Sequence, residues 1–494
     1  MFICEYAHAM GNAIGNLKEY WESIESSSST IGGAIWDWVD QAIYEPKDIL
    51  NGTYEGRLHT GYDFPGPHQG NFCSNGIVPA TRHESPKLKE VKAIYQYVKF
   101  ALAEKNVKKN TVSVNINNTY DFITLNGYEL IWETVENGNI VGKDSMLLPA
   151  IAPDMSQDFA LKLSGTNLRN AEKNGSEVML NLYVRNTRPT EWSDAGHLVA
   201  QKQFELSSRS MLPALRSNSK VGKLNVEKNE KEITVGNAFV FAAFDTSTGR
   251  MTELRINGLD VIYGKQGFLY DNHRYIENDR GPSVTDNGLE PTGTCNVVEE
   301  SDGRVVVTTM RGGSLCDSEI IYTFLPNGIV DMDVKLTPKT KELYRAGLVC
   351  AVNAGLDNVD YYAYGPWENY IDRKDGCMIG RYSTTVDDMV ERYVKPQSMG
   401  NRESLRELKL TGKDGCGICI ETEGSVSFSA LRYTDADLLN AKHMWELQKR
   451  PYIVLHLDAQ VRGLGNGSCG PTTLDTYKIA PMPFSYKLRI SYTD

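Results

Sequence analysis

Hydrophobic and polar residues alternate with a period of two through long stretches of the chain. Between residues 106 and 216 the alternation is clean in 111–117 and returns in 177–184, which predicts half-buried strands. Asn-Gly pairs at 126–127 and 137–138 separate such runs and are typical of hairpin turns. A segment of about 110 residues with this pattern predicts an immunoglobulin-like β-sandwich.

Residues 217–494 show many short apolar runs divided by Gly, Asn and Asp. Clear examples are 305–308, 319–324, 329–336 and 484–492. Many short β-rich runs separated by turn residues predict a large antiparallel β-sandwich.

Residues 1–105 mix helical periods with short apolar runs. One helix is expected from near residue 12 to residue 26, and a short apolar strand is expected in 32–38. A second helix is expected over 85–99, with lysines on the side opposite its apolar face, which is made of Leu88, Val91, Ile94 and Tyr95. The segment 52–75 is rich in Gly, Pro and His, and a loop of this length is uncommon unless it is functional.

Length and composition agree with a chain of several domains. The chain has 494 residues, which suggests about three domains. The net charge of −11 argues against nucleic-acid binding, because an acidic surface repels phosphates. No apolar run approaches the ~20 residues needed to cross a bilayer, so we expect no membrane partner. The nine cysteines are scattered and odd in number, which argues against a disulfide framework and favours a reducing, cytoplasmic location.

Glu5 is the first candidate for chemistry. It follows a short apolar lead, with His8 three positions later and Asn12 beyond. The simple alternative is a surface glutamate. A buried carboxylate at the end of a strand, with hydrogen-bonding side chains around it, can instead act as a nucleophile or a general base.

The segment 36–41, Trp-Asp-Trp-Val-Asp-Gln, is the second candidate. Both tryptophans could belong to the core. Alternatively, one ring lies flat beneath a ligand, since an aromatic face suits the C–H face of a sugar, and the neighbouring carboxylates serve its hydroxyl groups.

Asn75 is the third candidate, at the end of the glycine-rich loop. Most Asn-Gly pairs, like Asn75-Gly76 here, are simple turns. Backbone carbonyls together with an Asn amide oxygen also suit a hard cation such as sodium or calcium.

Together these motifs resemble the large bacterial β-galactosidases of glycoside hydrolase family 2. The resemblance extends over essentially the whole chain, in the segments 3–12, 32–41, 71–76, 191–197, 364–373 and 400–403. It implies a mainly β, multidomain fold: the C-terminal piece of a TIM (β/α)8 barrel in 1–105, an immunoglobulin-like β-sandwich in 106–216, and a large β-sandwich in 217–494. The substrate implied is a β-galactoside, hydrolysed with retention of configuration, and full-length relatives imply a homo-oligomer.

The resemblance also implies roles for single residues. Glu5 would be the catalytic nucleophile, His8 would hydrogen-bond galactose hydroxyls, and Trp36 would form the floor under the sugar. Asn75 would bind the C6 side of the sugar and, with the Phe72 carbonyl, a sodium ion. The loop 463–471 would reach the mouth of the site with Cys469, where some members of the family have a tryptophan.

Several parts that the family requires are not found in this sequence. The resemblance places the acid/base glutamate, most ligands of a magnesium ion and an aspartate of the sodium site upstream of residue 1. We therefore expect a fragment with negligible activity by itself. Two alternatives remain open: a relative acting on another β-linked sugar, such as a glucuronide or a mannoside, and a non-catalytic β-sandwich that binds carbohydrate or mediates assembly. The longer segment 270–280 has no role that the sequence assigns.

Overall fold

The computed structural model describes residues 1–52, 57–214, 222–279, 289–340 and 343–494. The predicted boundary between residues 216 and 217, and Arg280, therefore lie outside the described residues. The chain divides into two compact units. One contains residues 1–89, 214–377 and 382–494, and the other contains 90–213 and 378–381. No helix in the described ranges is both long and apolar enough to cross a membrane.

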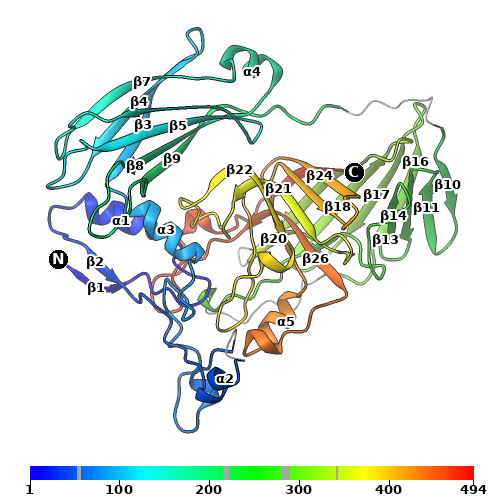
Figure 1. Cartoon of the computed structure of the whole chain (residues 1–494). Helices are drawn as coiled ribbons and strands as arrows, with labels where there is room; N and C mark the ends of the chain where they lie inside the picture. The colour runs from blue at the N-terminus through cyan, green and yellow to red at the C-terminus, as the bar shows by residue number, and fades with distance from the viewer. Residues whose placement is uncertain (53–56, 215–221, 280–288, 341–342) are drawn as a thin grey trace. The chain divides into compact units, whose positions relative to one another are not determined.

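The N-terminal region contains one pair of parallel strands, β1 and β2 (Figure 1). Ile3 pairs with Gly33 and Tyr6 with Ile35, which is the pairing of neighbouring strands in a TIM barrel. The elements of this region are β1 Ile3–Tyr6, α1 Leu17–Glu25, β2 Gly33–Ile35, α2 Pro46–Leu50, the 3-10 helix η1 Gly61–Asp63 and α3 Pro86–Ile94.

Three elements of this region differ from the sequence-based expectation. The first helix begins at Leu17, not near residue 12, because Ile14 and Asn16 have left-handed φ angles of 59° and 58° that an α-helix does not accept. Strand β2 ends before Trp36. Helix α3 ends at Ile94, because the chain from Val98 onward pairs as a strand.

The smaller unit is a sandwich of two antiparallel sheets, as predicted. One sheet has the order β3-β4-β7 and the other β6-β5-β8-β9. Its elements are β3 Val98–Asn106, β4 Thr111–Asn118, β5 Tyr128–Glu136, β6 Asn139–Leu147, β7 Ser156–Lys162, α4 Leu168–Asn174, β8 Val178–Asn186 and β9 Leu198–Ser207. Strand β4 buries every second residue, which is the period that the sequence shows. The Asn137-Gly138 turn has positive φ angles at both residues, 48° and 82°, so it closes the β5–β6 hairpin as expected.

The larger unit contains three further sheets. The first has five strands: β10 Asn225–Lys228, β11 Glu232–Gly236, β12 Val240–Asp245, β13 Arg250–Ile256 and β14 Leu259–Asp260. The second has four, in the order β15 Leu269–Asp271, β20 Arg345–Asn353, β26 Tyr452–Val461 and β25 Ser427–Leu431. The third has nine, in the order β16 Thr294–Glu299, β17 Val305–Arg311, β18 Cys316–Phe324, β19 Val330–Pro338, β27 Phe484–Thr493, β24 Gly417–Glu423, β23 Glu407–Thr411, β21 Asn358–Gly365 and β22 Met378–Thr385.

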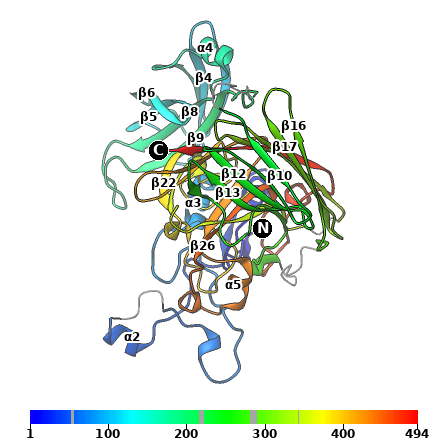
Figure 2. The same cartoon turned by 90° about the vertical axis from the view of Figure 1, so that its right-hand side faces the viewer.

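The nine-stranded sheet confirms the expected antiparallel architecture. Neighbouring strands from β16 to β21 are all antiparallel, and β16 and β17 run side by side in both views (Figures 1 and 2). Strand β18 alternates strictly between buried and half-buried positions. One apolar core therefore covers one side of the sheet, and it includes Tyr322, Phe324 and Leu488.

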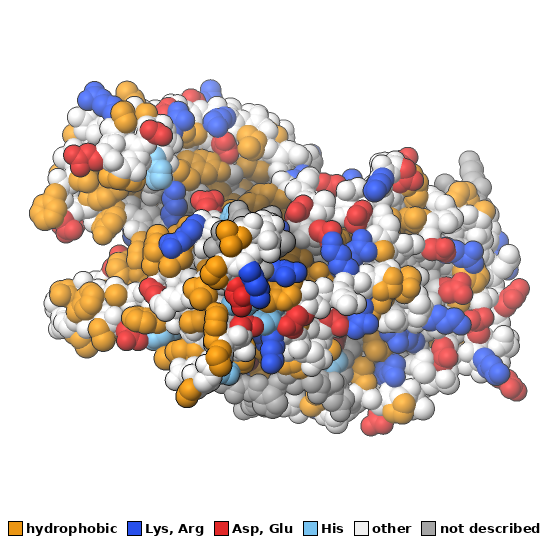
Figure 3. Space-filling view, turned by 60° about the horizontal axis from the view of Figure 1, so that its bottom comes forward, with side chains coloured by type: hydrophobic (Ala, Val, Ile, Leu, Met, Phe, Trp, Pro, Cys, Tyr) orange, Lys and Arg blue, Asp and Glu red, His pale blue; other side chains and the backbone are white. Residues whose placement is uncertain are grey.

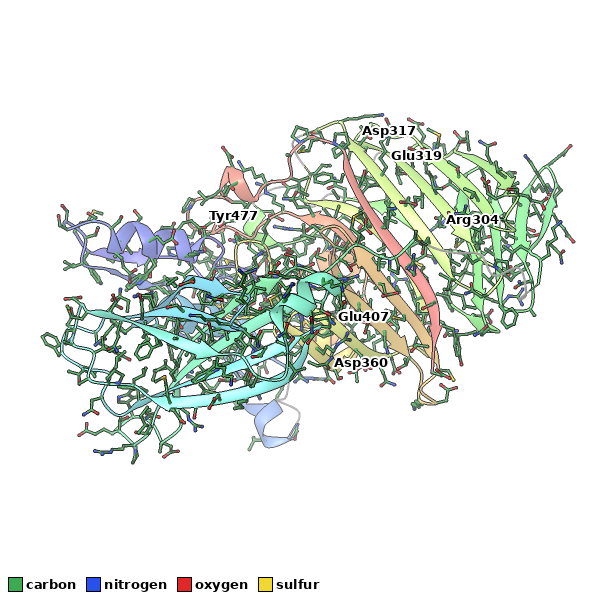
Figure 4. All side chains as sticks on the ribbon, turned by 90° about the horizontal axis from the view of Figure 1, so that it is seen from above. Arg304, Asp317, Glu319, Asp360, Glu407 and Tyr477 are labelled. Carbon is green, nitrogen blue, oxygen red and sulfur yellow. The ribbon has the colours of Figure 1, made fainter. Side chains whose placement is uncertain are left out.

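The face shown in Figure 3 carries both charged and hydrophobic side chains. Acidic and basic side chains are interspersed on this face. Asp317 and Glu319, two positions apart on β18, are labelled in Figure 4 and point to the same side of the strand. The elements outside the sheets of this unit are α5 Asp435–Asn440 and the 3-10 helices η3 Glu277–Asp279, η4 Asp387–Met389, η5 Met444–Glu446 and η6 Asp475–Tyr477.

Candidate active site

Strand β1 delivers Glu5 to its carboxyl end, where parallel strands of a barrel present functional side chains. The Glu5 side chain is 49% exposed. The sequence-based expectation of a buried carboxylate is therefore wrong for this structure. The physical reason is that β1 pairs only with β2 in the described sheet, so no neighbouring strand covers its other edge.

His8 lies directly against Glu5. Its Nε2 is 3.0 Å from Glu5 Oε2, and its side chain is only 11% exposed. Between them Ala7 takes a left-handed φ of 47°, which turns the chain out of the strand. This turn allows two side chains three positions apart to meet, and the contact with His8 uses Glu5 Oε2.

Backbone hydrogen bonds join the three segments that the sequence singles out. Trp36 N donates to Tyr6 O at 3.0 Å, and Ala9 N donates to Trp36 O at 2.8 Å. Asp37 N donates to Asn75 O at 2.6 Å. The segments that carry Glu5, Trp36 and Asn75 are thus adjacent at the same end of β1 and β2.

Neither tryptophan belongs to the core. Trp36 is 39% exposed and Trp38 is 59% exposed, so the interpretation of both rings as core residues is wrong. Asp37 Oδ2 accepts a hydrogen bond from Gln41 Nε2 at 2.8 Å, which fixes the carboxylate beside the rings. The arrangement leaves aromatic surface available at the end of the strands.

Asn75 closes the third segment in a tight turn. Its Nδ2 donates to Phe72 O at 3.1 Å, and its Oδ1 is buried with no hydrogen-bond partner among the described residues. Gly76 is required here, because a Cβ at this position would lie 2.1 Å from Asp40 N. An amide oxygen and a carbonyl of one turn are ligands of the type that a hard cation takes.

Lys87 holds the loop after Glu5 and the turn after Asn75 together. The sequence pattern did not identify this residue. Its Nζ donates to Ala9 O at 2.7 Å and to Gly76 O at 2.6 Å, and the residue is 3% exposed. Burial lowers the pKa of Lys87 to about 8, while the charge of Asp40 opposes this shift. Burial also raises the pKa of Asp40. Lys87 therefore fixes the segment after Glu5 to the turn that contains Asn75.

The closeness of Asn12 to Glu5 in the sequence suggested a contact between them. In the structure, the hydrogen bonds of Asn12 go to the large sandwich instead. It is fully buried, and its Nδ2 donates to Tyr370 Oη at 2.9 Å and to Ser398 O at 3.0 Å. Its backbone N donates to Gln397 Oε1 at 3.2 Å. The loop after β1 is thus anchored to residues more than 350 positions away, a contact that no local pattern predicts.

The loop 463–471 also reaches the N-terminal region. Asn466 Nδ2 donates to Gly15 O at 2.6 Å, and Gly15 N donates to Gly465 O at 3.1 Å. Cys469 is exposed. In the described parts of the chain, no hydrogen bond links the Cys469 side chain to Glu5, His8, Trp36 or Asn75. Of the predicted site residues, Cys469 alone is not brought into the network.

The segment 270–279 holds this loop in place. Arg274 pairs with Asp279 at 3.0 and 2.8 Å and donates to Gly463 O at 3.0 Å. Asn278 Nδ2 donates to Leu464 O and Gly465 O at 2.9 and 2.6 Å. The segment 270–279 therefore supports the loop 463–471.

The two late motifs of the sequence, 364–373 and 400–403, meet around Glu368. Its Oε1 accepts hydrogen bonds from Arg373 Nη2 at 2.5 Å and from Tyr393 Oη at 2.8 Å. Its Oε2 accepts one from Gly400 N at 2.7 Å. Arg373 also donates to Ala13 O at 2.8 Å, so this buried ion pair supports the segment that follows the candidate site.

Comparison with protein families identifies the chain. The family described as "Beta galactosidase small chain" matches residues 236–490, which is more than half of the sequence. The chain belongs to the β-galactosidases of glycoside hydrolase family 2. Two further families match other parts of the chain: "Glycosyl hydrolases family 2, TIM barrel domain" over 1–100 and "Beta-galactosidase, domain 4" over 114–207.

Curated relatives agree with this assignment. A β-galactosidase of Priestia megaterium is 30% identical over 94% of this chain. Those of Pseudoalteromonas haloplanktis and Actinobacillus pleuropneumoniae are 27% and 28% identical over 99% of it. The chain spans slightly less than half of the length of these relatives, between 44% and 48%.

The candidate site draws on two of the matched regions. Glu5, His8, Trp36, Phe72, Asn75 and Lys87 lie in the region that matches the TIM barrel domain. The loop 463–471 and its supports lie in the region that matches the small chain. Lys87 could have been suspected from its position beside Leu88 at the edge of the apolar face of α3, but its two carbonyl partners depend on the fold.

Proposed function

We propose that this chain carries the nucleophile of a retaining β-galactosidase, which hydrolyses terminal non-reducing β-D-galactose residues. The observation that carries the proposal is the Glu5–His8 pair at the end of a parallel strand, with Oε2 and Nε2 3.0 Å apart. This pair lies in the region that matches the TIM barrel domain, and active sites of such barrels lie at that end of the strands.

The proposed reaction has two steps. Glu5 Oε1 attacks the anomeric carbon while a carboxylic acid protonates the glycosidic oxygen, which gives a galactosyl ester of Glu5. Water then cleaves this ester, and the same carboxyl group acts as the base. His8 would hold Glu5 Oε2 so that Oε1 faces the sugar, and it would also reach galactose hydroxyls.

The proton donor is proposed to lie about 5–5.5 Å from Glu5, the separation found in retaining glycosidases. In the described part of the chain, the Glu5 side chain pairs with His8, and no hydrogen bond joins it to a second carboxyl group. We therefore propose that these 494 residues by themselves have negligible turnover, because leaving-group departure from an ordinary galactoside needs an acid.

Trp36 and Asn75 would bind the sugar. The exposed part of the Trp36 ring offers a face for the C–H side of galactose, and the buried Asn75 amide would bind the C6 hydroxyl. Cys469 is proposed to line the aglycone side through the loop 463–471, where a thiol offers less stacking surface than an aromatic ring.

The Phe72 carbonyl and Asn75 Oδ1 fit a sodium ion, since Oδ1 is a buried oxygen without a hydrogen-bond partner in the described residues. When bound, sodium would supply a fixed positive charge beside the C6 hydroxyl. The residues present do not fit a magnesium ion at Glu5: of the described side chains, no group of three potential metal ligands includes Glu5 or His8. No step is therefore derived through magnesium.

A chimera tests this proposal. The part of the Priestia megaterium relative that precedes the matched region would be joined before residue 1, and the first product would be followed by NMR. We expect β-galactose to appear first, and preference for galactosides over glucuronides and mannosides. Glu5→Gln should lower kcat at least about a thousandfold. First formation of α-galactose, or full turnover by the Glu5→Gln chimera, would contradict the proposal.

A further inference from the structure

A second cluster of chemically active side chains lies in the large sandwich, and Ser398 links it to Asn12 of the loop after Glu5. The four-stranded sheet β15-β20-β26-β25 borders a cavity of about 340 Å³. Among its lining residues are Asp271, His273, Asp435 and His456. Asp271 ends β15, His456 lies within β26, and Asp435 begins α5, which lies next to β26 in both views (Figures 1 and 2).

We propose that Asp271, Asp435 and His456 bind a divalent first-row transition metal ion, whose remaining coordination positions face the cavity. The inference does not depend on the proposed hydrolytic function. Ligand atoms of the three side chains all lie within 4.8 Å of one another. Asp271 Oδ2 is 3.5 Å from His456 Nδ1, and Asp435 Oδ2 is 3.5 Å from His456 Nε2. The two carboxylates approach different ring nitrogens, so an ion held about 2.0–2.2 Å from one nitrogen and from both carboxylates draws the farther carboxylate toward it.

The two carboxylates are already oriented by neighbouring side chains. His273 Nδ1 lies 2.6 Å from Asp271 Oδ1, and Ser398 Oγ donates to Asp435 Oδ1. Each carboxylate therefore has one oxygen engaged by a hydrogen-bond partner, while its other oxygen faces His456. Metal ligands in proteins are typically held by outer hydrogen bonds of this kind.

His456 supplies an independent sign of a ligand. Its side chain is 93% buried, being 7% exposed, yet Nδ1 has no hydrogen-bond partner in the described part of the chain. A buried polar atom of this kind is costly unless it is satisfied. Burial and the charge of Arg345 lower the pKa of His456 to about 3, so its imidazole is neutral and has a lone pair to donate.

The charges of the cluster also favour a cation. Asp271, Asp435 and Asp458 surround the single guanidinium of Arg345, whose Nε is 3.9 Å from Asp271 Oδ2 and whose Nη1 pairs with Asp458. With all three carboxylates ionised, these groups sum to a formal charge of −2. Burial raises the pKa of Asp458 to about 7, and a bound cation would favour its ionised form. A divalent ion would balance this charge.

The donor set indicates the class of metal and leaves room for a further ligand. One imidazole and two carboxylates suit ions such as Zn²⁺ or Mn²⁺ better than an all-oxygen site would. Three protein ligands beside a cavity are typical of sites that keep a position open for water or a small molecule.

Mn²⁺ titration of the 494-residue chain, followed by electron paramagnetic resonance, tests the site. Mn²⁺ binds thiols poorly, so the nine free cysteines do not interfere. We expect one saturable equivalent per chain, and at least about a tenfold loss of affinity in Asp435→Asn and in His456→Gln. His443→Gln is the matched control, because His443 is an equally buried imidazole between two carboxylates, Asp63 and Glu446, at 2.9 and 2.7 Å.

Absence of saturable binding, or an equal loss of affinity in the His443→Gln control, would overturn the proposal. Near-UV circular dichroism establishes that each variant is folded. Co²⁺ provides a measurement that needs no variant: nitrogen and oxygen ligands give weak visible bands without a thiolate charge-transfer band. A thiolate band at one equivalent of Co²⁺ would show that the metal binds at cysteine, and this result would also overturn the proposed site.

Discussion

At the scale of single residues, buried polar side chains determine where the candidate nucleophile lies. Lys87 is the clearest case, since its ammonium group binds the carbonyls of both Ala9 and Gly76. Those two carbonyls belong to the loop after Glu5 and to the turn after Asn75. The geometry around Glu5 therefore depends on a side chain that contacts no substrate.

Lys87→Met should destabilise the protein by about 3 kcal/mol, because it leaves two buried carbonyls without a donor and Asp40 without its neighbouring cation. Urea unfolding measures this loss. Lys92→Met, at an exposed position of the same helix, should change the free energy of unfolding by less than about 0.5 kcal/mol. Equal effects of the two substitutions would contradict the role assigned to Lys87.

The pH dependence of the same comparison gives a second readout. The pKa of Lys87 is lowered from 10.5 to about 8 in the folded protein, so between these values the unfolded chain binds more protons. The contribution of Lys87 to the free energy of unfolding is therefore fully present above pH 10.5. It decreases as the pH falls toward 8 and is lost below that value. The difference between the wild type and Lys87→Met should grow by up to about 3 kcal/mol from pH 8 to 10.5.

The proximity of His8 to Glu5, but not the support of this pair, follows from local sequence. Glu5 and His8 are three positions apart, so a short motif is enough to pair them. The helix pattern places lysines in general opposite the apolar face and does not single out Lys87, because periodicity shows only where apolar residues lie. Asn12 was placed near Glu5 for a similar reason, and its actual partners, Tyr370 and Ser398, come from a distant part of the chain.

At the scale of elements, loops rather than strands join the N-terminal region to the large sandwich. The loop 463–471 is fixed on one side by Gly15 and Asp372, and on the other by Asn278. Strands were predicted well, because the alternation of apolar and polar residues in β4 and β18 matches the alternation of buried and half-buried positions. Helix ends were predicted less well, because the left-handed backbone at Ile14 and Asn16 leaves no mark in the hydrophobic pattern.

Gly15→Ala should loosen this junction. A Cβ at Gly15 would lie 2.0 Å from Asp372 Oδ2 and 2.4 Å from Gly465 N, so backbone must move and the hydrogen bonds of the loop must break. We expect faster amide hydrogen exchange across 463–471 and a loss of about 2 kcal/mol in stability. Gly312→Ala is the control, since its Cβ would come no closer than 3.4 Å to another atom, and the idea fails if both variants exchange alike.

At the scale of the whole molecule, each of the two compact units has an apolar core of its own among the described residues. One lies in the immunoglobulin-like sandwich and includes Leu182. The other lies in the large sandwich and includes Leu488. Because each compact unit buries its own apolar side chains, the protein should not unfold as a single two-state system.

Calorimetry of two core variants tests this division. Leu182→Ala and Leu488→Ala each remove a fully buried side chain and should cost about 2–5 kcal/mol. We expect each substitution to lower the midpoint of a different thermal transition and to leave the other within about 1 °C. A single transition that both variants shift equally would show that the two cores unfold together.

The central claim is that Glu5 forms a covalent bond with galactose. The most direct measurement uses a fluorinated galactoside with dinitrophenolate as leaving group, which departs without an acid catalyst, added to the full-barrel chimera and followed by peptide mass spectrometry. The account predicts time-dependent inactivation, with one sugar attached to the peptide that contains Glu5 and none attached after Glu5→Gln. Attachment to a different carboxylate, in a chimera that turns over galactosides, would contradict it.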